Sequence, residues 1–230
     1  MTPILLVGTY NYSSWSLRPW LCLTWAGIAF QERLVDLDQA GYGGDGIAEL
    51  KLLSPSAKVP VLEVAGERIW DSLSIAEWAA DASGQLLPAN PVERALVRSA
   101  VAEMHSGFPA LRRDLPMNIR RRCRAHGLGA DCLRDLDRLT ALWHWGRTRF
   151  AARGPYLFGT RSLADAFYLP VAARLRTYAV TLASPAAEAY GAMLLEDEAF
   201  RAWETRVSAE PQRNFSQVPL DAVYPGTDLA

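Results

Sequence analysis

The sequence has few of the residues that mark disulfide-rich or zinc-binding proteins. Its 230 residues include only three cysteines, Cys22, Cys123 and Cys132. They are odd in number and lack the paired spacing of a zinc site, which argues against a disulfide framework and against a metal centre. A reducing compartment therefore fits this chain best.

The chain also lacks an excess of basic charge and a long apolar run. Lys and Arg number 24 against 25 Asp and Glu, giving a net charge of −1, so a globally basic surface for nucleic acid is absent. No apolar stretch approaches about 20 residues, and Met1-Thr2-Pro3 leads directly into an apolar run without a basic leader. We expect a cytoplasmic protein that binds neither nucleic acid nor membrane.

The remaining composition is typical of a folded protein. Half of the residues are apolar and 21% are charged. The chain is long enough for two modest domains. Strand and helix patterns alternate at the start, and glycine and proline interrupt the periodicity at 83–91. We predict one domain at 1–82, a linker at 83–91, and a second domain at 92–230.

The first domain reads as a mixed α/β unit in the order β-α-β-α-β-β-α. Short apolar runs predict the strands, with Gly66 in the turn between the last two. The predicted strands cover 4–7, 30–37, 59–64 and 68–70. Helical spacing of apolar side chains predicts the helices. The predicted helices cover 15–25, 47–53 and 73–82.

In the second domain no strand pattern recurs, so we expect it to be all-helical. Apolar side chains keep a 3- and 4-residue spacing in the long helices. The expected helices cover 96–111, 133–143, 166–175 and 196–207. Pro109 should kink or end the first of these. The S-x-x-D form of Ser162 to Asp165 marks a helix start. We expect the tail after Glu210 to be irregular.

The most informative stretch is Ser13-Ser14-Trp15-Ser16-Leu17-Arg18, where a strand ends and a helix begins. The first-turn N–H groups of a helix have no partners within the helix, and the macrodipole gives that end about half a positive charge. Hydroxyls at such an end are suited to stabilising an anion. The alternative is that Ser13 or Ser14 is only an N-cap.

Two further stretches could contact a peptide-like ligand. Pro60 donates no hydrogen bond and keeps the preceding residue extended, which leaves the backbone of Val59 free to pair with a peptide. Asp71 and Ser72 follow a predicted strand and offer a carboxylate and a hydroxyl for an α-ammonium and an α-carboxylate. These residues could also form a simple capping cluster, since Ser74 and Glu77 have capping-box spacing.

Taken in order, these features resemble the thioredoxin-like domain of cytosolic-type glutathione S-transferases, and the helical half is similar to the second domain of that family. Ser162 to Asp165, followed by Pro170, resembles the capping box of the helix at the core of the second domain. The stretch Ser13 to Arg18 is similar to the zeta-class pattern S-S-C-x-x-R, which maleylacetoacetate isomerases share. Trp15 stands where that class has cysteine.

The resemblance implies glutathione as a co-substrate, with no permanently bound cofactor and no metal. It puts Ser13 against the glutathione sulfur, with Ser14 as the alternative, and it implies a cis Val59–Pro60 bond. Lys58 would reach the glycine carboxylate, and Asp71 and Ser72 the γ-glutamyl end. The residues expected to bind glutathione are Trp15, Lys58, Val59, Pro60, Asp71 and Ser72.

A second substrate, the electrophile, is expected between the two domains. The residues expected to line its pocket are Tyr12, Met104, His105, Phe108, Arg112 and Arg176. For His105 the alternative is a hydrogen-bonded, partly buried histidine. For Met104 and Phe108 it is ordinary core packing.

The activity implied by the resemblance is transfer of the glutathione thiolate to a small hydrophobic or unsaturated electrophile, as in detoxification, by a homodimer. Two alternatives stay open. One is a glutathione-dependent cis-trans isomerase, in which Arg112 or Arg176 would hold a substrate carboxylate. The other is a non-catalytic binding or scaffold protein with the same fold.

Overall fold

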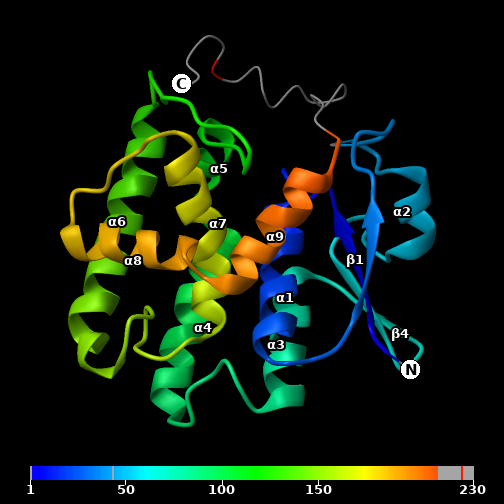
Figure 1. Ribbon diagram of the computed structural model, residues 1–230, viewed down its shortest axis with the longest axis horizontal. Helices are drawn as coiled ribbons and strands as arrows, with labels where there is room; N and C mark the ends of the chain where they lie inside the picture. Colours follow the sequence, from blue (N-terminus) through cyan, green and yellow to red (C-terminus); the bar gives the residue numbers. More distant parts are fainter. Residues whose placement is uncertain (1, 43, 212–223, 225–230) are drawn as a thin grey trace.

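The computed structural model describes residues 2–42, 44–211 and 224. A small sheet domain is followed by a larger group of helices (Figure 1). The four-stranded sheet has the order β2-β1-β3-β4, with β1 and β2 parallel and the other pairs antiparallel. The strands are β1 (Ile4–Gly8), β2 (Gln31–Val35), β3 (Val61–Val64) and β4 (Glu67–Ile69).

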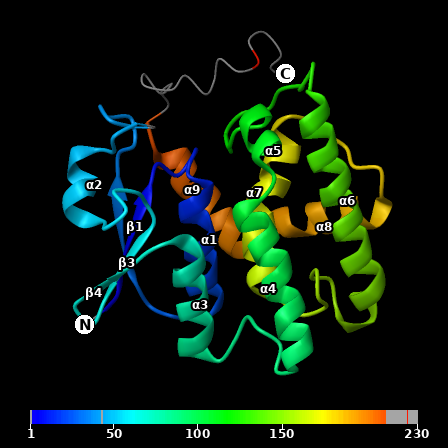
Figure 2. The same ribbon diagram turned by 180° about the vertical axis from the view of Figure 1, so that it is seen from behind.

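Three helices accompany the sheet, namely α1 (Ser14–Trp25), α2 (Ala48–Leu53) and α3 (Ser72–Ser83). Helices α1 and α3 pack together on the side of the sheet that faces the helical domain, and α2 lies on the other side (Figures 1 and 2). Strand β1 is central, and its residues from Leu5 onward are buried, as expected for a short apolar strand covered on both faces. This arrangement is the predicted thioredoxin-like order.

The second half of the described chain is helical, with two isolated β-bridges near residue 158. Its α-helices are α4 (Pro91–Ser106), α5 (Pro109–Asp114), α6 (Ala130–Phe150), α7 (Leu163–Thr177), α8 (Pro185–Leu195) and α9 (Glu198–Ala209), and a 3₁₀ turn covers Ala151–Arg153. The predicted fold class, α/β followed by all-α, is thus confirmed.

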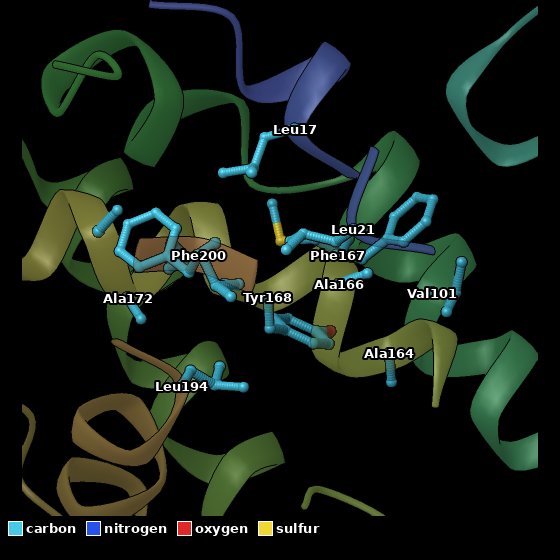
Figure 3. Close-up of a cluster of buried hydrophobic side chains, with 14 of the residues drawn as sticks. Leu17, Leu21, Val101, Ala164, Ala166, Phe167, Tyr168, Ala172, Leu194 and Phe200 are labelled. Carbon is cyan, nitrogen blue, oxygen red and sulfur yellow. The ribbon is translucent and has the colours of Figure 1, made fainter. Parts of the chain in front are cut away.

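Helix α7 is the centre of the helical domain and packs against α1, α4 and α8. Nearly all of its side chains are buried, and Figure 3 shows Phe167, Tyr168 and Ala172 of this helix in one hydrophobic cluster with Leu17 and Leu21 of α1. Both domains therefore share one hydrophobic core. The start of α1 is fixed relative to the helical domain because the two helices are packed together.

The long helix expected over 96–111 ends early, as predicted from Pro109, and one further helix was not expected. The run predicted over 96–111 is broken at Gly107, so that α4 ends at Ser106 and Pro109 opens the separate helix α5. Helix α8 was not predicted, because its many alanines give little contrast between an apolar and a polar face.

Residues 84–90 connect α3 and α4, within the stretch 83–91 that the sequence predicts as a linker. The expectation for the tail beyond Glu210 falls, except for Pro211 and Tyr224, outside the described residues. None of the helices in the described ranges is long and apolar enough to cross a membrane.

Candidate active site

The loop from Thr9 to Ser13 joins β1 to α1 and folds back on itself. The backbone N–H groups of Tyr12 and Ser13 both donate to the carbonyl oxygen of Thr9, at 3.2 and 2.9 Å. Ser13 is the N-cap of α1, and its Oγ accepts a hydrogen bond from the N–H of Ser16 at 3.3 Å. Ser13 therefore is a cap, as the alternative interpretation required, and it also stands at a positively polarised helix end.

Ser14 makes a different contact. Its Oγ accepts a hydrogen bond from Nη2 of Arg174 at 3.1 Å. Arg174 is buried and also donates to the carbonyl oxygens of Leu115 and Pro170. Burial and, to a lesser degree, the nearby Arg112 lower the pKa of Arg174 to about 10. Helix α7 thus brings a buried cation to the second serine of the loop.

A cavity of about 460 Å³ opens between the serine loop, the segment before α2 and the segment before β3. The predicted site residues among those that line it are Tyr12, Ser13, Trp15, Lys58 and Val59. Ser14 is not among the lining residues. The Val59–Pro60 bond is cis, as the resemblance implies. The cavity therefore brings the first serine together with the exposed backbone ahead of β3.

Asp71 and Ser72 lie at the N-terminus of α3. The Oδ1 atom of Asp71 accepts hydrogen bonds from the N–H groups of Leu73 and Ser74, so this carboxylate caps the helix. Its Oδ2 atom lies 3.0 Å from Nε2 of His105 on α4. The Oγ atom of Ser72 is buried and has no hydrogen-bond partner in the structure. An unsatisfied buried hydroxyl is uncommon in folded proteins.

Trp15 stands at the centre of a cluster of cationic side chains. The guanidinium carbon of Arg18 lies 4.4 Å from the centre of the indole ring, and that of Arg112 lies 5.1 Å from it. The ring of His105 meets Trp15 edge-on at 5.4 Å. Burial, followed by repulsion from Arg112 and Arg174, lowers the pKa of Arg18. Two guanidinium groups therefore lie against the indole ring of Trp15.

Five of the six predicted pocket residues do not line the cavity. Met104 and Phe108 are buried in the main core, which agrees with the packing interpretation. Arg176 forms an ion pair with Glu204 at 2.6 Å and lines a separate cavity beside α8. His105 and Arg112 lie near Trp15 without lining the cavity, and Arg112 donates to the carbonyl oxygen of Met104.

Sequence reasoning missed several residues of the site. The far wall of the cavity comes from the glycine-rich segment before α2, to which the sequence analysis assigned no role. Its lining residues are Leu37, Gly41, Tyr42, Gly44, Asp45, Gly46 and Ile47. Arg18 belongs to the serine motif, but the sequence analysis assigned it no role. The sequence analysis named Arg176 as a pocket residue and did not name Arg174.

None of the residues that line the cavity is a cysteine. Burial raises the pKa of Cys22, and it raises that of Cys132 to about 11. Among the residues that the structure describes, no group of acidic, histidine or cysteine side chains could hold a metal ion. Thiol chemistry in this cavity would therefore use a sulfur atom that arrives with a ligand.

Comparison with known proteins agrees with this geometry. Residues 12–82 match the family model described as "Glutathione S-transferase, N-terminal domain". A probable maleylacetoacetate isomerase of Caenorhabditis elegans is 30% identical over 111 residues, which cover 47% of this chain and 49% of the relative. A maleylacetoacetate isomerase of Rhizobium meliloti is 38% identical over 96 residues, which cover 39% of this chain and 43% of the relative. The chain thus spans about half the length of these curated relatives.

The fold extends the likeness over the whole described chain. The crystal structure of a glutathione transferase homologue from Burkholderia, with bound glutathione, superimposes with a TM-score of 0.70 at 20% identity, covering 90% of this chain and 99% of that one. A thioredoxin-like domain with a cavity at its first helix and a helical second domain defines the glutathione transferase class of folds. Residues 12–82 therefore resemble the N-terminal domain of glutathione S-transferases, and the described chain has the fold of a glutathione transferase.

Proposed function

We propose that the protein is a glutathione S-transferase, in which the thiolate of bound glutathione attacks a small hydrophobic or unsaturated electrophile. The observation that carries this proposal is that one cavity brings Ser13 together with Lys58 and Val59. These are three residues for which the family resemblance implies contacts with the sulfur, the glycine carboxylate and the cysteinyl backbone.

The energetics of the serine site are sufficient for this chemistry. A cysteine thiol has a pKa of about 8.5, and a good nucleophile at neutral pH needs a pKa about 2 lower, which corresponds to about 3 kcal/mol. A hydroxyl that donates to a thiolate contributes about 1.5 to 3 kcal/mol. A helix N-terminus adds about 0.3 to 1 kcal/mol. The sum reaches the requirement without a protein base.

The role of Ser13 is therefore to donate a hydrogen bond and not to act as a nucleophile. A serine hydroxyl does not accept a proton at pH 7, so the thiol proton leaves to solvent when the thiolate forms. The sulfur then forms a bond to the electrophilic carbon, and either a leaving group departs or, on a conjugated double bond, a proton is taken up. The hydroxyl stabilises the anion before this attack.

Contacts to the remainder of glutathione are assigned from the family resemblance. The Val59 backbone would pair with the cysteinyl unit, and Pro60 and Trp15 would border it. Lys58 is exposed and would meet the glycine carboxylate. At the other end, the unpartnered hydroxyl of Ser72 would bind the γ-glutamyl carboxylate, beside Asp71.

The electrophile would bind on the side of Trp15 and Tyr12, where the indole is 36% exposed. Arg112 and His105 lie against the same ring and would set the polarity of this part of the pocket. A homodimer in the cytoplasm is the assembly and location that we propose with this activity.

A second candidate is a glutathione-dependent cis-trans isomerase, in which the thiolate adds reversibly to a conjugated diacid. The observation that favours it is the guanidinium of Arg112, which lies 5.1 Å from the centre of the Trp15 ring and could hold a substrate carboxylate. Two relatives bear the name maleylacetoacetate isomerase. Of the two arginines expected to hold a carboxylate, Arg176 is paired with Glu204, and Arg112 takes this role in the proposal.

One set of assays separates these functions. Conjugation of chlorodinitrobenzene and isomerisation of maleylacetone are measured on the same preparation, together with calorimetry of glutathione binding. Rapid conjugation with slow isomerisation supports the transferase, and the reverse supports the isomerase. Absence of glutathione binding at millimolar concentration would contradict both and would favour the non-catalytic scaffold.

A further inference from the structure

Ser16 lies directly behind Ser13 and has no assigned role. Its side chain is fully buried. Its Oγ accepts a hydrogen bond from the backbone N–H of Gly8 at 2.9 Å and lies 2.8 Å from the Oγ of Ser13. The end of β1, the hydroxyl of Ser16 and the hydroxyl of Ser13 therefore form one continuous line of hydrogen bonds.

In the ligand-free arrangement, Ser13 donates its hydroxyl hydrogen to Ser16. A serine hydroxyl has one hydrogen and two lone pairs, and the hydrogen rotates to suit its neighbours. If Ser13 turns its hydrogen to a sulfur anion, it can keep its contact with Ser16 only as the acceptor. Ser16 can then become the donor, since its hydroxyl donates to no other group in the described structure.

We propose that Ser16 is a positioning residue for the thiolate site, and this proposal rests on the proposed glutathione-dependent function. When glutathione is bound, the hydrogen bonds run from the Gly8 N–H to Ser16, from the Ser16 hydroxyl to Ser13, and from the Ser13 hydroxyl to the sulfur. Hydrogen bonds in such a chain polarise one another, and each is strengthened by about 10 to 30%. Ser16 thereby makes Ser13 a better donor and fixes its direction.

A purely structural role for Ser16 predicts something different. Its bond to Gly8 satisfies a backbone N–H at the end of β1, so its loss should lower stability in any case. A role limited to the overall stability of the fold would leave the pKa of the glutathione thiol unchanged in the folded protein, because Ser16 is separated from the sulfur by Ser13. The thiol pKa therefore distinguishes the two roles.

The test is a pH titration of the thiolate absorbance of glutathione bound to the full-length protein. We expect Ser16→Ala to raise the apparent pKa of the bound thiol by about 0.5, a roughly threefold loss of thiolate at pH values below that pKa. Ser16→Thr retains a hydroxyl and should keep the pKa near that of the unmodified protein. Ser184→Ala, which removes a buried helix cap of α8, is the control for lost stability alone.

A double-mutant cycle tests whether Ser16 acts through Ser13. Once Ser13 is alanine, Ser16→Ala should cause no further rise in the thiol pKa. An unchanged pKa in Ser16→Ala with a lowered melting temperature would overturn the proposal, and so would additive effects in the cycle. If the unmodified protein binds no glutathione, or binds it with an ordinary thiol pKa, the proposed function itself fails and the role of Ser16 falls with it.

Discussion

The carboxylate of Glu210 accepts a hydrogen bond from the backbone N–H of Tyr10 at 2.8 Å, across 200 residues of sequence. Its second oxygen accepts from the N–H of Asn11 at 3.1 Å. Arg120 in turn donates to the carbonyl oxygen of Glu210 at 2.6 Å. The end of α9 thus holds the loop that carries Ser13.

We predict that Glu210→Ala raises the apparent thiol pKa of bound glutathione by about 0.5 to 1, because a loosened loop holds Ser13 less well. An effect of charge alone has the opposite sign, since removing a carboxylate near a thiolate favours the anion. Titration of the thiolate absorbance gives the answer. Glu204→Ala, which removes a carboxylate from α9, is the control. A lowered thiol pKa of bound glutathione in Glu210→Ala would contradict the prediction.

The role of Lys58 can be tested with a shortened ligand. If its ammonium group binds the glycine carboxylate, Lys58→Ala should weaken glutathione binding about 3- to 10-fold. The affinity for γ-glutamylcysteine, which lacks the glycine, should stay unchanged. Calorimetry with both ligands measures the two affinities. An equal loss of affinity for both ligands would show that Lys58 does not bind the glycine carboxylate.

Blocking the protein's own thiols should leave its activity intact. With a pKa of about 11, about one Cys132 side chain in a thousand is ionised at pH 8. Cys22 is fully buried, and its pKa is also raised. After iodoacetamide treatment of the native protein at pH 8 and removal of the reagent, we expect fewer than one modified thiol per chain and full turnover. In denaturant all three cysteines should react. Loss of turnover on native alkylation would indicate a cysteine mechanism.

The helical domain should depend strongly on Asp165. This buried carboxylate accepts hydrogen bonds from the N–H groups of Leu157 and Ser162 and from the hydroxyls of Ser162 and Tyr190. Asp165→Ala leaves these donors unsatisfied and should lower the free energy of unfolding by about 3 to 4 kcal/mol. Asp165→Asn keeps one acceptor oxygen and should cost less. Urea denaturation measures both, and a loss below about 1 kcal/mol in the alanine variant would refute this role.

The serine loop, the residues before β3 and the start of α3 could be predicted because each depends on local sequence. The end of a strand, a helix cap and a proline can each be recognised from a few neighbouring residues. These local patterns led to the predictions of Ser13, Val59 and Asp71 as site residues. The family resemblance then joined these separate signals into one site.

The choice between Arg174 and Arg176 could not be made in this way. Residues two apart on an α-helix point about 200° apart, so only one of the two can face α1. The packing of α7 decides which one does, and that packing involves residues more than a hundred positions away along the chain. The far wall of the cavity was missed for a related reason, since the glycine-rich segment before α2 carries no pattern of its own.

The central claim is that the Ser13 hydroxyl stabilises the thiolate of bound glutathione. Its most direct test is the pH titration of that thiol in Ser13→Ala and, in parallel, Ser14→Ala. We predict that Ser13→Ala raises the apparent pKa by about 1 to 2, or about 1.4 to 2.7 kcal/mol, while Ser14→Ala has the smaller effect. An unchanged pKa in Ser13→Ala, with or without a rise in Ser14→Ala, would contradict the account.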